Sequence, residues 1–125
     1  LVTDGLAEPR GELGHERRAF ELLRELGADG LVLLVFIPTP GTRYADRQPP
    51  KVPAVAELVA EARLSFPDVP LYLGCMRPKG RYRDELDPLA VRAGVNVLVS
   101  PSRPARRLAG ELGLAARNMR ECCVL

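Results

Sequence analysis

Three cysteines are the side chains of this chain best suited to binding a soft metal. Cys75 stands in the middle of the sequence, and Cys122 and Cys123 are adjacent near its end. Thiolates bind soft metals, so these three cysteines are candidate metal ligands. Two alternatives stay open: a buried Cys75 with incidental tail cysteines, or a prenylation box formed by the final Cys-Cys-Val-Leu.

A basic stretch follows Cys75 directly, with Arg77, Lys79, Arg81 and Arg83 at alternate positions. Guanidinium groups bind carboxylates and phosphates through paired hydrogen bonds, and an ammonium group binds them as a point charge. We therefore expect Lys79 and Arg81, together with Ser100 in a later loop, to bind a substrate. The alternative is a solvated basic loop without a ligand.

Standard catalytic motifs are missing from the sequence. His15 is the only histidine, and it stands between Glu12 and Glu16, where it could act as a base or simply lie on the surface at the opening of a helix. There is no GxGxxG motif, no P-loop and no HExxH motif. The usual dinucleotide, phosphate-loop and zinc-protease interpretations therefore fail.

Four apolar runs alternate with four helical patterns. The runs have no regular polar alternation, which is typical of strands covered on both faces in a parallel sheet. Strands are predicted in residues 1–6, 31–37, 70–74 and 95–100, and helices in 16–26, 55–65, 87–93 and 104–112. Glycines suited to a left-handed C-cap follow three of these helices, at Gly27, Gly94 and Gly113. Asp84 or Asp87, and Ser102, are predicted N-caps.

These repeated βα units predict an α/β fold with parallel strands and right-handed crossovers. Two architectures suit them: a small doubly wound sheet, or the C-terminal half of an eight-stranded barrel. In both, ligands bind beyond the C-terminal ends of the strands. We expect a barrel half in residues 1–114 and a tail in residues 115–125. Because the sequence begins inside a strand-like run, we also expect it to belong to a longer protein.

Composition excludes several classes of protein. A net charge of +2 in 125 residues gives no reason to expect nucleic-acid binding. The longest apolar run, residues 30–38, is far shorter than the roughly 20 residues needed to cross a bilayer. An odd number of cysteines and no signal-peptide pattern favour a reducing cytoplasm and no membrane partner.

Four short motifs resemble the latter half of the radical S-adenosylmethionine (radical SAM) barrel. They are GLAE at 5–8, FIPTPGT at 36–42, PLYLGCMRPKGR at 70–81 and LAVRAGVNVLVSPS at 89–102. The likeness is greatest to biotin synthase and to the archaeal-type two-component lipoyl synthases, and it extends from residue 1 to about residue 114. The resemblance implies an enzyme that cleaves S-adenosylmethionine at a 4Fe-4S cluster and inserts sulfur at an unactivated carbon.

The resemblance also implies roles for individual residues. Gly5, Leu6 and Glu8 match the motif that places the ribose or methionyl part of S-adenosylmethionine. Ile37 and Pro38 match the apolar strand end that lies against the adenine. The substrate of such an enzyme would be a small molecule or a carrier-bound acyl group, and a related second subunit could take part in the reaction.

Arg77 matches an arginine that belongs to the auxiliary, sulfur-donating cluster of biotin synthase, and we expect it to be catalytic or to clamp a substrate carboxylate. Cys75, Cys122 and Cys123 would then be candidate ligands of such an auxiliary cluster. The sequence departs from the family in lacking Cys-x3-Cys-x2-Cys, which in the family lies upstream of all these motifs. The chain is therefore not expected to be active alone.

Two alternatives to this function remain. One is a non-catalytic, doubly wound α/β module that binds a ligand or serves as a partner subunit. The other is a different radical enzyme of the same barrel type, such as a methyltransferase or a carbon-skeleton enzyme, using Arg77 for a carboxylate.

Overall fold

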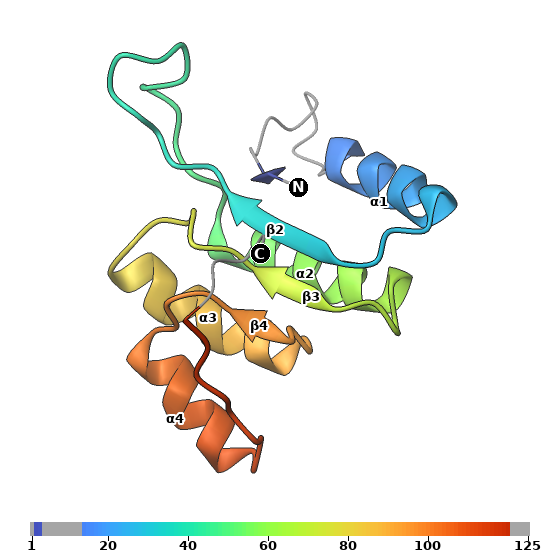
Figure 1. Cartoon of the computed structure of the whole chain (residues 1–125). Coiled ribbons are helices and arrows are strands. Elements are labelled where there is room, and N and C mark those ends of the chain that lie inside the picture. Colours follow the sequence, from blue (N-terminus) through green and yellow to red (C-terminus); the bar gives the residue numbers. More distant parts are fainter. Residues whose placement is uncertain (1, 4–13, 121–125) are drawn as a thin grey trace.

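The computed structural model describes residues 2–3 and 14–120 (Figure 1). Strands and helices alternate along the chain. In order they are β1 (Val2–Thr3), α1 (Gly14–Leu26), β2 (Leu31–Val35), α2 (Val52–Ser65), β3 (Leu71–Leu73), α3 (Arg81–Arg92), β4 (Val97–Leu98) and α4 (Arg103–Glu111). The predicted succession of four βα units is confirmed.

The four strands form one parallel sheet in the order β1-β2-β3-β4. Each strand therefore pairs with the next one along the chain. Right-handed crossovers between such neighbours place every connecting helix on the same face of the sheet. Within the described strands, the order never reverses, as it would at the switch point of a doubly wound sheet. The α/β class and the parallel strands are thus confirmed.

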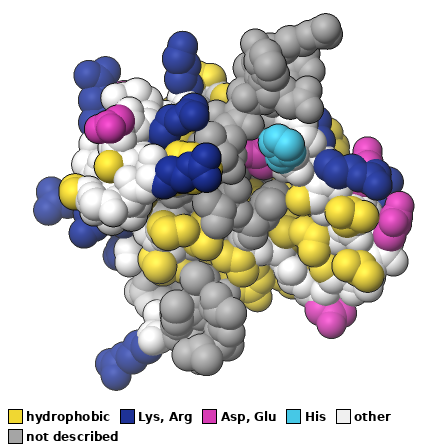
Figure 2. All heavy atoms as spheres, turned by 90° about the horizontal axis from the view of Figure 1, so that it is seen from above, with side chains coloured by type: hydrophobic (Ala, Val, Ile, Leu, Met, Phe, Trp, Pro, Cys, Tyr) yellow, Lys and Arg dark blue, Asp and Glu magenta, His cyan; other side chains and the backbone are white. Residues whose placement is uncertain are grey.

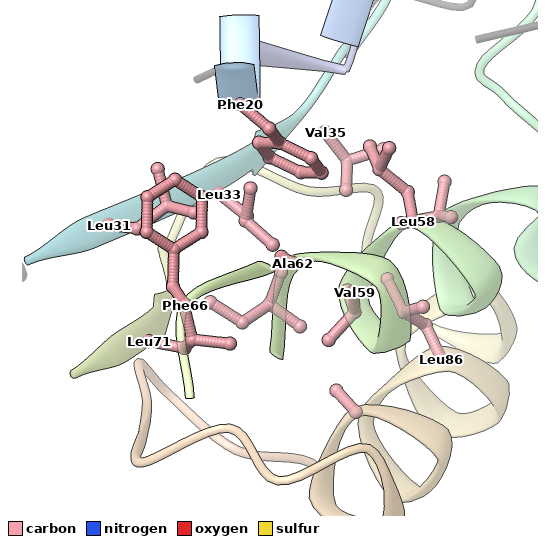
Figure 3. Packing of buried hydrophobic residues seen from close by; sticks show 13 residues of the cluster. Phe20, Leu31, Leu33, Val35, Leu58, Val59, Ala62, Phe66, Leu71 and Leu86 are labelled. Carbon is pink, nitrogen blue, oxygen red and sulfur yellow. The ribbon is translucent and has the colours of Figure 1, made fainter. Parts of the chain in front are cut away.

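The hydrophobic core lies between the sheet and its layer of helices. Alternate residues of β2, namely Leu31, Leu33 and Val35, are buried there because side chains of a strand point to opposite faces in turn. Figure 3 shows them in one cluster with side chains from α2. Phe20 of α1 meets Phe66 edge to face, with ring centroids 6.0 Å apart, and joins α1 to the end of α2.

The opposite face of the sheet is less covered. Val32 and Leu34 of β2 and Tyr72 of β3 are only half-buried. Gly74 follows β3 on this side, and a Cβ atom there would collide with a methyl group of Leu34. Leu34 thus lies over the glycine and occupies the place of its missing side chain.

Arg63, near the end of α2, fastens the N-terminal ends of two strands. Its guanidinium donates to the carbonyls of Phe66, Val69 and Gly94 and to the side chain of Asn96. The Asn96 side-chain oxygen also accepts from the backbone N–H where β3 begins. One arginine therefore stabilises the turn after α2, the start of β3 and the approach to β4.

The predicted helix-end glycines and the predicted N-cap at Ser102 are confirmed. Gly27, Gly94 and Gly113 all have positive φ, as predicted for left-handed helix ends. Ser102 caps α4, where its hydroxyl oxygen accepts from the backbone N–H of Ala105 at 3.4 Å.

The predicted start of the third helix was wrong. The helix begins at Arg81, so Asp84 and Asp87 lie inside it, and Gly80 with φ 64° precedes it. Pro88, a residue type more common in the first turn of a helix, lies in the middle of this one.

Candidate functional site

The loops that follow the strands converge at one edge of the sheet. Because the strands are parallel, residues after β2, after β3 and after β4 all emerge at the same end. The segment after β3 is hydrogen-bonded to its neighbours on both sides. The N–H of Val35 donates to the carbonyl of Met76 at 2.8 Å, and Ser100 accepts from arginines of the β3 loop and α3. This edge of the sheet is the candidate site, and the loops after β2, β3 and β4 form its rim.

Arg77 is buried inside the domain and is not exposed at the edge of the sheet where a ligand would bind. Its side chain is fully buried and forms a bidentate ion pair with Asp87 of α3, with Nε–Oδ1 at 2.8 Å and Nη2–Oδ2 at 2.9 Å. Nη1 donates to the carbonyl of Gly74, and Nη2 also approaches the carbonyl of Ser100 at 3.4 Å. An internal carboxylate therefore occupies the fork that was expected to bind a substrate carboxylate.

The same carboxylate fixes the next loop. Oδ2 of Asp87 accepts a hydrogen bond from the backbone N–H of Ser102 at 2.8 Å, at the start of α4. Arg77 and Asp87 thus join three segments: the loop after β3, the middle of α3 and the loop after β4. Their role in this geometry is to position the rim of the site.

Arg83, one turn before Asp87 on α3, reaches the same rim from the outside. Its Nη2 donates to the carbonyls of Cys75 at 3.1 Å and Arg77 at 3.2 Å, and its Nη1 approaches the carbonyl of Ser100 at 3.4 Å. Its Nε is buried without a partner. Burial, with the neighbouring Arg77 charge, lowers the pKa of Arg83, since both disfavour the charged form.

Ser100 lies in the loop between β4 and α4 with φ 49°, the one described non-glycine residue with positive φ. Non-glycine residues in this left-handed region are uncommon and cluster at functional sites. Ser100 is exposed, and its carbonyl faces both arginine side chains. The structure therefore brings Ser100 to Arg77 and Arg83.

Lys79 and Arg81 lie farther out on the surface. Arg81 is almost fully exposed, and its Nε donates to Glu85 one turn along α3 at 2.7 Å. Lys79 is also exposed. No individual role was predicted for Arg83, the basic residue of α3 that approaches the Ser100 carbonyl as closely as Arg77 does. The usable signal was its spacing, four residues before Asp87 on one face of α3.

Cys75 is exposed at the end of β3, with a free thiol. Within residues 14–120, no group of three or more histidine, cysteine or acidic side chains is placed to hold a metal ion. Cys122 and Cys123 lie outside the described residues, as do Gly5, Leu6 and Glu8. The predictions made for those five residues stay predictions.

Ile37 and Pro38 follow β2 at the same edge, where Ile37 is exposed and Pro38 half-buried. Beside them Phe36 meets Tyr44 edge to face, with centroids 6.5 Å apart. The guanidinium of Arg43 lies 5.7 Å from the centre of the Tyr44 ring. The loop after β2 thus offers apolar and aromatic surface at the rim.

Tyr82 of α3 holds the far end of that loop. Its hydroxyl donates to the carbonyl of Pro50 at 2.7 Å, just before α2 begins. Burial raises the pKa of Tyr82 to about 12, because the buried phenolate would lose its hydration. The contact fixes the loop after β2 to the helix that carries Arg83.

His15 and Glu16 begin α1 and differ in burial. His15 is exposed and is the one cyan side chain in Figure 2, with dark blue Lys and Arg side chains on either side of it. Glu16 is buried, and its Oε1 atom has no hydrogen-bond partner. No described contact joins the two to Arg77 or Arg83.

Comparison with protein families, with curated proteins and with solved structures finds no match. None of the described helices is long and apolar enough to cross a membrane.

Proposed function

We propose that the chain is the C-terminal half of a radical SAM barrel enzyme of the biotin and lipoyl synthase type, which inserts sulfur at an unactivated carbon in the cytoplasm. The observation that supports it best is the sheet order. Four consecutive parallel strands with their helices on one face form the arrangement found in half of an eight-stranded βα barrel. The family-like loops after β2, β3 and β4 leave that sheet at its C-terminal edge.

The fit to S-adenosylmethionine rests on the loop after β2. Exposed Ile37 and half-buried Pro38 next to Phe36 form an apolar shelf of the kind that suits a purine. In this proposal these residues bind the adenine and exclude water, while S-adenosylmethionine supplies the radical chemistry when bound.

The iron-sulfur clusters do not fit the described residues. Cys75 is their one free thiol, and no three-ligand group accompanies it in residues 14–120. The ligands of the radical-generating cluster would belong to an upstream segment, and those of an auxiliary cluster would have to include the tail cysteines. Arg77 contributes by positioning, since its fork is already bound to Asp87.

Iron and sulfide content of the anaerobically reconstituted full-length protein tests the proposal, together with formation of 5'-deoxyadenosine from S-adenosylmethionine. We expect at least one 4Fe-4S cluster and reductive cleavage. Iron beyond one cluster would favour sulfur insertion, and a single cluster would leave another radical enzyme of this barrel type. A protein without iron would contradict the proposal.

The cysteine ligands can be tested separately by replacing Cys75, Cys122 and Cys123 with serine in the full-length protein. If they bind an auxiliary cluster, a defined share of the iron is lost and cleavage of S-adenosylmethionine continues. Iron content equal to that of the unsubstituted protein would exclude these ligands.

The second candidate is a non-catalytic α/β subunit that binds a ligand or a partner. The lack of a three-ligand metal group in residues 14–120 and of Cys-x3-Cys-x2-Cys in the printed sequence favours it. The absence of iron from the reconstituted protein, combined with retained ligand binding, would support this candidate.

A further inference from the structure

Arg83 is a cation held between two loops of the rim without a carboxylate of its own. Its described hydrogen bonds all go to backbone carbonyls, two in the loop after β3 and one at Ser100. A carbonyl oxygen carries only a partial charge, so these bonds orient the guanidinium without neutralising it. The geometry fixes the position of a positive charge at the edge where ligands of βα folds bind.

No described carboxylate is bound to Arg83. Both oxygens of the nearby buried Asp87 are already bound by Arg77, and one also accepts from Ser102. Of the other acidic side chains in this part of α3, Glu85 is paired with Arg81 on the surface, and Asp84 is exposed and has no described bond to Arg83. The guanidinium of Arg83 is thus partly buried without a counterion bound to it, which is unfavourable.

Two further features show where a counterion would enter. The contact from Nη1 of Arg83 to the Ser100 carbonyl is long, 3.4 Å, and therefore weak. Nε is buried and has no hydrogen-bond partner among the described residues. A small shift of this half-buried side chain would exchange the weak contact for an anion and leave the stronger bonds to Cys75 and Arg77 in place.

We propose that Arg83 binds an anionic group, a carboxylate or a phosphate, between the loop after β3 and Ser100 in the loop after β4. Ser100 holds a left-handed backbone conformation there, and its exposed position leaves the approach open. Under the proposed function, this anion belongs to the substrate. Only that assignment rests on the proposed function, because anion binding needs neither a cluster nor S-adenosylmethionine.

Titration of the full-length protein with inorganic phosphate and, separately, with acetate tests the inference at matched ionic strength. The readout is the nuclear magnetic resonance signal of the Arg83 Nε–H group, with sodium chloride as the control for screening. A saturable shift with phosphate alone identifies a phosphate site, and one with acetate identifies a carboxylate site. No saturable shift with either anion overturns the proposal.

Arg83→Gln should weaken binding of the effective anion at least about tenfold, the loss expected for a charge-assisted hydrogen bond. Arg81→Gln is the matched control, since it removes the same charge from the same turn of α3 but lies on the surface with Glu85. Equal binding by the two variants would contradict the role of Arg83.

Arg83→Gln also removes bonds to three carbonyls, so its fold must be checked by circular dichroism. If that variant does not fold, wild-type protein answers the question through modification of arginines by phenylglyoxal, mapped by mass spectrometry. We expect saturating anion to protect Arg83 and to leave Arg81 reactive. Equal reactivity of Arg83 with and without anion would overturn the inference, whatever the outcome of the iron measurements.

Discussion

At the scale of single residues, the Arg77–Asp87 pair governs the rim. Both side chains are fully buried, and a pair of this kind contributes through what it positions more than through net stability. Three segments depend on it, including the start of α4 at Ser102. The pair therefore keeps the loops after β3 and β4 at a fixed separation.

Arg77→Ala should lower the free energy of unfolding by about 3–5 kcal/mol, because Asp87 would stay buried without its partner. The measurement is chemical denaturation followed by circular dichroism. The double variant Arg77→Met/Asp87→Leu should recover most of the loss, since it removes both charges and keeps apolar volume. A loss under 1 kcal/mol for Arg77→Ala would contradict the buried pair.

The burial of Arg77 could not be predicted from the sequence. An arginine in a basic stretch after a strand looks like a surface or ligand-binding residue, and its partner lies ten positions away on a helix that was predicted to start at that partner. Strands were predicted from apolar runs and helix ends from glycines. Both patterns depend only on residues close together in the chain, and these predictions were right. The ion pair depends on how a loop folds back onto α3, which no local pattern encodes.

At the scale of elements, α3 holds the loops of the site in place through three of its side chains. It carries Arg83 toward the rim, Asp87 into the interior and Tyr82 toward the loop after β2. The α/β class and the order of the elements followed from hydrophobic runs alone. The true start of α3 did not, because Pro88 in mid-helix imitates a helix start.

Tyr82 makes the stability of this arrangement dependent on alkaline pH. Its pKa is raised from 10.0 to about 12 by burial. Between these values the unfolded chain loses the phenolic proton while the folded chain keeps it, so the free energy of unfolding falls as pH rises from 10 to 12. Below pH 10 the contribution is fully present.

Denaturation of wild type and Tyr82→Phe at pH 8, 10 and 11 provides the measurement. At pH 8 the variant should be less stable by about 1 kcal/mol, the usual value of one hydrogen bond, here the bond to Pro50. The difference should shrink toward pH 11. A difference that stays constant over this range would show that Tyr82 does not titrate with folding.

At the scale of the whole molecule, one layer of helices covers one face of the sheet, and the other face carries half-buried apolar side chains such as Val32 and Tyr72. In the proposed complete barrel this face lines the interior. A parallel sheet is ordinarily covered on both faces.

Val32→Glu in the full-length protein tests that placement. If the face lines a packed barrel, the new carboxylate is buried, and the free energy of unfolding should fall by at least about 2 kcal/mol. Leu64→Glu on α2 is the control, because Leu64 is 81% exposed and its replacement should change stability by no more than about 0.5 kcal/mol. Equal, small effects of both substitutions would exclude a barrel interior on this face.

Leu34 and Gly74 form a pair on that same face, in which the leucine side chain fills the space left by the glycine, which has no side chain. The space on this face of the sheet is filled jointly by the two positions, because any side chain at 74 must displace the end of Leu34. Exchanging the two residues, Leu34→Gly with Gly74→Leu, would move the side-chain bulk from one strand to its neighbour at constant total volume. Under the proposed function, this exchange would reshape the space open to a substrate without altering a charged residue at the rim.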